Sequence, residues 1–81
     1  MSAEEVLYQS PMLYRVLREA GGGLVIEAVV GGMAMYTVRV RLSDDEASAY
    51  AREGRGFADR MAKAIMADPK YGGRAYEVPD A

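Results

Sequence analysis

The feature that most constrains the fold is a pair of apolar, β-branched runs on either side of a double glycine. Residues 24–30 read LVIEAVV and residues 36–42 read YTVRVRL, with Gly31 and Gly32 between them. The first run is rich in strand-forming residues, and the second alternates apolar and polar residues with the period of two expected of a half-buried strand. The stretch therefore predicts an antiparallel β-hairpin.

The length of the connecting loop sets which side chains share a face, because a shift of one residue moves a whole strand to the opposite face. A three-residue loop, Gly31–Gly32–Met33, places the alternating apolar residues of the two strands on one side. The predicted partners are then Leu24 with Val40, Ile26 with Val38, Ala28 with Tyr36, and Val30 with Ala34. In this register Glu27 faces Thr37, and Arg39 lies diagonal to Glu27.

The segments around this hairpin predict a small α+β domain. Residues 12–20 are expected to form a strand, because a triple glycine at 21–23 leads directly into the next one. Ser43 and Glu46 fit a capping box at the start of a helix, and apolar residues then recur every three or four positions as far as Asp68-Pro69. Two glycines interrupt this helix, and a kink or break is expected near Gly56. Gly54 lies on the apolar stripe, where the missing side chain would let helix and sheet approach closely.

The predicted fold is thus a three-stranded antiparallel meander packed against one long helix, with a short N-terminal helix and a possible fourth strand at the C-terminal edge. All 81 residues form a single domain. Its parts are a short helix or lead-in at 1–11, the β-meander at 12–42, the long helix at 43–68, and a tail or edge strand at 69–81, with residues 74–78 as the strand candidate. The short helix is expected because Ser2 and Glu5 fit a second capping box.

Composition argues against several classes of function. The chain has no cysteine and no histidine, so it lacks disulfides, the usual zinc ligands and the side chains most used as nucleophile and general base. The acidic cluster at 44–46 is expected to cap a helix rather than to bind a metal. No secretory signal and no apolar run of membrane-spanning length are present, so we expect a cytoplasmic protein with no membrane association. We expect no enzyme activity, no metal and no cofactor.

The outer face of the predicted sheet is the leading candidate for a binding site. It is half apolar and half charged, and such a face is normally covered rather than left in contact with water. We expect it to mediate homodimerisation or binding to a protein partner in a small bacterial-type protein. The residues assigned to this interface are Val25, Glu27, Val29, Met35, Thr37, Arg39 and Arg41.

Two other functions were considered. The first is binding of a small anionic ligand in a pocket at the helix–sheet edge, because arginine and tyrosine side chains suit such ligands. Its candidate residues are Tyr36, Tyr50, Tyr71 and Arg74. The second is nucleic-acid binding, against which the net charge of −2 argues.

Overall fold

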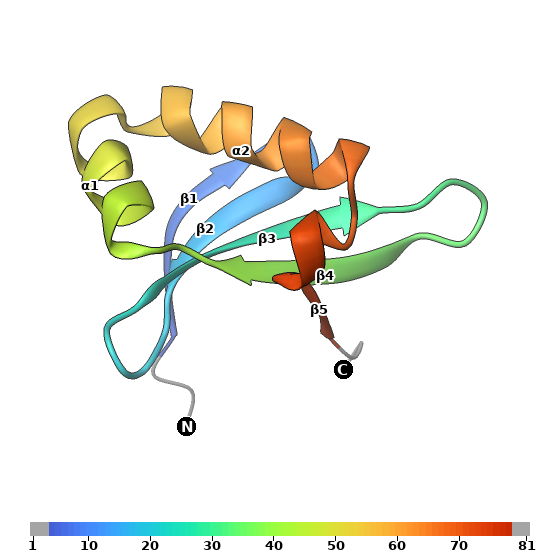
Figure 1. Cartoon of the computed structure of the whole chain (residues 1–81), viewed down its shortest axis with the longest axis horizontal. Coiled ribbons are helices and arrows are strands. Elements are labelled where there is room, and N and C mark those ends of the chain that lie inside the picture. The colour runs from blue at the N-terminus through green and yellow to red at the C-terminus, as the bar shows by residue number, and fades with distance from the viewer. Residues whose placement is uncertain (1–3, 79–81) are drawn as a thin grey trace.

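The computed structural model describes residues 4–78, which form one antiparallel sheet with helices on one of its faces (Figure 1). The strands are β1 (Glu5–Ser10), β2 (Tyr14–Arg18), β3 (Leu24–Val30), β4 (Tyr36–Arg41) and β5 (Tyr76–Val78), and they lie side by side in chain order. Between β4 and β5 come α1 (Asp44–Glu53), α2 (Arg55–Ala67) and the short 3-10 helix η1 (Tyr71–Gly73). The α+β class is as predicted, but the sheet has five strands, so the three-stranded meander was wrong.

Within the described residues the predicted N-terminal helix is a strand, β1, which pairs with β2. Ser2, the capping residue predicted for that helix, lies outside the described residues. Val6 and Tyr8 of β1 lie opposite Leu17 and Val16, with an irregularity in the register between them. A helix of this length is marginally stable by itself, whereas a strand gains hydrogen bonds along one side from the neighbouring β2. The predicted edge strand at the C-terminus is present as β5, shortened to three residues beside Thr37, Val38 and Arg39 of β4.

The central hairpin has the predicted faces with a different register. Val30 pairs with Tyr36, so five residues, 31–35, connect the strands instead of three. Because both loop lengths are odd, the same side chains share a face, but Glu27 now lies directly opposite Arg39 rather than Thr37. Gly31 has a φ of 96°, and a Cβ atom there would lie 2.7 Å from the carbonyl oxygen of Ala34, so this position of the loop requires glycine.

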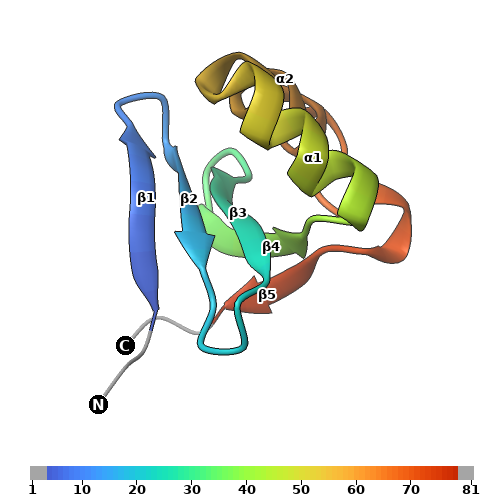
Figure 2. The same ribbon diagram turned by 90° about the vertical axis from the view of Figure 1, so that its left-hand side faces the viewer.

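The hydrophobic core lies between α2 and one face of the sheet (Figure 2). Alternate residues of β2, β3 and β4 point into it, and α2 supplies four buried residues at helical spacing. The core residues are Tyr14, Val16, Ile26, Ala28, Val30, Val38, Val40, Ala58, Met61, Ala62 and Ile65. The opposite face of the sheet, which we call the outer face, therefore carries no helix.

The predicted long helix is divided into α1 and α2 at Gly54. This residue has a φ of 65° and a ψ of −137°, a conformation that side-chain-bearing residues rarely adopt. The break was expected near Gly56, which instead lies within α2, and the predicted close approach at Gly54 is wrong because a Cβ atom there would meet nothing within 4 Å. Within residues 4–78, no helix is long and apolar enough to cross a membrane.

Candidate interaction surface

The strand register arranges the outer face in three cross-strand rows. Leu17, Val25 and Arg41 form the first row, Arg15, Glu27 and Arg39 the second, and Val29 and Thr37 the third. Six of the seven residues predicted for the interface lie in these rows, and Met35 lies in the β3–β4 loop beside the third. The rows differ in accessibility, so each is described in turn.

The second row is a network of charges that the chain neutralises itself. The carboxylate of Glu27 accepts hydrogen bonds from Nε of Arg15 at 2.7 Å and from Nε of Arg39 at 2.8 Å. Nη1 of Arg39 also donates to Glu4 at 2.6 Å, although Glu4 directly precedes β1 and Arg39 lies in β4. This contact reaches past β2 and β3, so the outer face is concave and its side chains converge.

Burial and hydrogen bonding set the pKa values of this network. Burial by itself would raise the pKa of Glu27, but the hydrogen bonds from Arg15 and Arg39 outweigh it and hold this pKa below its ordinary value. The hydrogen bond from Arg39 likewise lowers the pKa of Glu4, and the bond to Glu4 is the main cause of the raised pKa of Arg39. The charged groups of this row are therefore fixed as ions and already paired.

The first row is closed to a partner over most of its length. Leu17 and Val25 are almost completely buried, although neither lies on the side of the helices. Nε of Arg41 donates to Glu19 at 2.9 Å, and its guanidinium lies 5.3 Å from the ring centroid of Tyr76. The buried apolar part of the outer face is thus covered within the domain.

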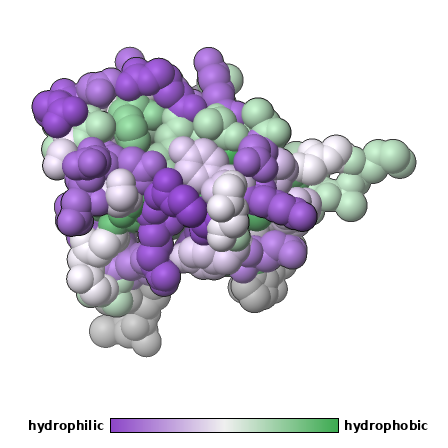
Figure 3. Space-filling model, viewed as in Figure 1, coloured by the Kyte–Doolittle hydropathy of each residue, from purple (hydrophilic) through white to green (hydrophobic). Residues whose placement is uncertain are grey.

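Accessible apolar surface is concentrated beside the third row. Val29 and Thr37 are half-buried, whereas Met35 is 55% exposed and Met33 is fully exposed. Figure 3 shows an apolar projection where the β3–β4 loop leaves the domain. We call Val29, Met33, Met35 and Thr37 the hairpin surface.

Sequence reasoning missed Met33, together with Met12 and Leu13 in the turn between β1 and β2, which are 59% and 53% exposed. The sequence prediction places Met33 in the loop because of the strand register alone, and it begins a strand at residue 12, which lies inside the turn. The available signal was the uncharged stretch between Glu27 and Arg39, which includes a loop as well as two strands.

The four residues considered for an anionic ligand do not form one site. Tyr36 begins β4 and is 39% exposed, whereas Tyr50 and Tyr71 pack against the core. Arg74 and Tyr71 are in contact, but Nη2 of Arg74 already donates to Glu46 at 2.6 Å and to the carbonyl oxygen of Arg41 at 2.8 Å. A ligand anion would have to compete with Glu46 for this guanidinium.

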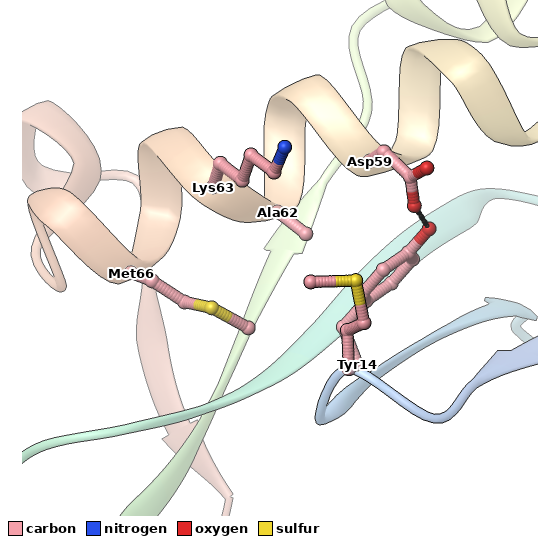
Figure 4. Close-up of a pocket in the computed structure, with 6 residues that line it drawn as sticks. Tyr14, Asp59, Ala62, Lys63 and Met66 are labelled. Carbon is pink, nitrogen blue, oxygen red and sulfur yellow. Dashed lines mark hydrogen bonds between the residues drawn. The ribbon is translucent and has the colours of Figure 1, made fainter.

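A cavity lies instead at the seam between α2 and the start of β2 (Figure 4). Its closed part holds only about 20 Å³, against about 200 Å³ when the open solvent at its mouth is included, and its lining residues are Met12, Tyr14, Asp59, Ala62, Lys63 and Met66. The hydroxyl of Tyr14 donates to Oδ1 of Asp59. Burial, followed by this bond, raises the pKa of Tyr14, so the hydroxyl stays protonated and serves as a hydrogen-bond donor.

Across residues 4–78, no group of three or more His, Cys, Asp or Glu side chains could hold a metal ion. Comparison with known proteins adds nothing further: no protein-family model matches the chain, and neither a curated protein nor a solved structure matches it significantly.

Proposed function

We propose that this chain is a small non-catalytic domain that self-associates through the hairpin surface. The observation that carries the proposal is the position of its exposed large apolar side chains. Those at the hairpin end of the sheet are Met12, Leu13, Met33, Met35 and Tyr36, whereas only Val6 and Tyr76 lie elsewhere on the described chain. Exposed apolar side chains gathered at one end of a domain mark interaction sites on proteins.

The composition of the surface supports a protein partner. Methionine is enriched in interface cores, and its flexible side chain adapts to an apolar neighbour. Residues 28–38 contain no charged side chain, so an apolar protein surface can cover them without burying an unpaired charge. A second copy is the simplest such partner, and a different protein is the alternative. The predicted cytoplasmic location and bacterial type remain predictions.

The proposal is tested by sedimentation velocity on a variant with charges on the hairpin surface. We expect the wild type to sediment as a dimer, and Val29→Glu with Met35→Glu to sediment as a folded monomer, because two carboxylates would be buried without partners. Ala51→Glu with Ala64→Glu is the matched control, since it adds the same charge at exposed helical positions. Met35→Glu alone serves if the half-buried Val29 does not tolerate the change.

A dimer that survives the double substitution would rule out the hairpin surface as the contact. A wild type that is monomeric at every concentration would rule out self-association. In that case the alternative is a different protein partner. Binding of that partner should be lost in Val29→Glu with Met35→Glu and retained in the helical control.

Binding of an anionic ligand stays as a second candidate only at Arg74 and Tyr71, the two of the four residues that are in contact, and it has a simple test. A ligand that binds the folded state raises its melting temperature. Phosphate, citrate and nucleotides should therefore raise the melting temperature of the wild type but not that of Arg74→Gln. No change with any of these anions would remove the hypothesis.

A further inference from the structure

The β3–β4 loop and the cavity beside α2 are two apolar features at the surface of the domain. The loop carries Met33, whose side chain is fully exposed. The cavity is a hollow with largely apolar walls, to which Met12, Ala62 and Met66 contribute. One feature is an apolar projection and the other an apolar recess.

Both features lie at the same end of the sheet. The turn at 11–13 and the loop at 31–35 each close a hairpin on that side, and the backbone N–H of Val29 donates to the carbonyl oxygen of Leu13 at 2.9 Å. Met12 belongs to this turn, and Met66 precedes the last residue of α2. Figure 4 shows Met66 and Tyr14 on either side of the cavity.

A projection and a recess at one end suit a two-fold symmetric pair. In such a pair a residue of the first copy contacts a site on the second, and the same contact is made in reverse. When two copies face each other with their hairpin ends, each loop extends toward the other copy's cavity.

The chemistry of the contact also favours a second copy. The loop brings no charge to the cavity, because the nearest charged residues in sequence are Glu27 and Arg39, which pair with each other. Of the two charged residues in the cavity lining, Asp59 is hydrogen-bonded to Tyr14, and Lys63 is exposed, so its ammonium group can stay in water. Met12 and Met66 are unbranched and flexible, so they can adjust around an inserted thioether.

We propose that two copies place their β3–β4 loops against each other, so that Met33 of each copy packs into the open mouth of the other copy's cavity between Met12 and Met66. The inference rests on the proposed function, because it names the second copy as the occupant and specifies the contact. Loss of the two inserted methionine side chains should raise the dissociation constant of the dimer at least about a hundredfold.

Disulfide trapping tests the contact directly, because the chain has no cysteine of its own. Met33→Cys protein labelled with ¹⁵N is mixed with unlabelled Met66→Cys protein and oxidised, so that the mixed disulfide has a mass between those of the two self-disulfides. We expect this pair to form a mixed disulfide faster than a pair of Met33→Cys with Ala51→Cys, whose partner position is exposed on α1. Equal rates for the two pairs would overturn the inserted geometry.

A second variant separates this inference from the proposed function. Met33→Glu changes a fully exposed side chain, so the fold should persist. If Met33→Glu leaves the dimer intact while Val29→Glu with Met35→Glu dissociates it, loop insertion is refuted and the hairpin surface stands. If the wild type is monomeric, both are refuted. Loss of the dimer in both variants, with fast trapping of the Met33–Met66 pair, supports loop insertion.

Discussion

Removal of the Glu27 carboxylate should destabilise the domain far more than removal of an exposed carboxylate in the same sheet. The side chain of Glu27 is 13% exposed and neutralises both Arg15 and Arg39. Glu27→Gln keeps the size of the side chain but removes the carboxylate to which Nε of Arg15 donates at 2.7 Å. Arg39 keeps its ion pair with Glu4 at 2.6 Å.

The magnitude follows from these contacts. Breaking a fully buried ion pair costs about 3–5 kcal/mol. The cost here should be smaller, because Arg39 retains Glu4 and the Arg15 side chain is 35% exposed. We expect a loss of about 2 kcal/mol in the free energy of unfolding, which for a domain of this size lowers the melting temperature by roughly 10 °C.

The assay is urea unfolding followed by circular dichroism near neutral pH. The matched control is Glu5→Gln, which removes the pair between Glu5 and Arg18, whose side chains are 60% and 50% exposed. Exposed pairs contribute less than about 1 kcal/mol, so the control should lose at most about 0.5 kcal/mol. Equal losses in the two variants would refute the claim that the central network is a buried, stabilising element.

Two further predictions concern acid stability and the helix break. The pKa values of Glu4, Glu27 and Glu46 lie below 4.5 in the fold, so their contribution to stability is complete above that pH and is lost as the pH falls through the lower folded values. The urea concentration at the unfolding midpoint should therefore decrease as the pH is lowered below about 4.5, and it should decrease less for Glu27→Gln than for the wild type. A midpoint that does not change with pH in this range would contradict a stabilising role of these ion pairs. Gly54→Ala should lower the free energy of unfolding by about 1–3 kcal/mol because of the backbone conformation at this position. Gly56→Ala should be neutral or stabilising by up to about 1 kcal/mol, because the nearest atom to the added Cβ is Nη1 of Arg60 at 3.9 Å. Urea midpoints measure both, and a Gly54→Ala variant as stable as the wild type would show that the break does not need glycine.

The sequence was informative where a local pattern decides the structure. Strand β3 has the predicted bounds, because its glycine neighbours and β-branched residues mark both ends. The capping box at Ser43 and Glu46 is present with both hydrogen bonds. The faces of the central hairpin also follow from alternation alone, which is insensitive to whether the loop has three residues or five.

The errors arose where a distant contact decides. The N-terminal segment has a capping-box pattern, yet it is a strand because β2 offers an edge to pair with. The loop length could not be read from the sequence, since the pairing of Glu27 with Arg39 depends on the whole hairpin. Likewise, the burial of Val25 and the contact between Glu4 and Arg39 depend on the curvature of the sheet.

The most direct test of the central claim is the mass of the wild-type chain in solution, measured by light scattering across a series of concentrations. The account predicts a mass that rises with concentration from that of the 8.8 kDa chain to twice that value. A mass that stays at the single-chain value to the highest concentration would contradict self-association through the hairpin surface.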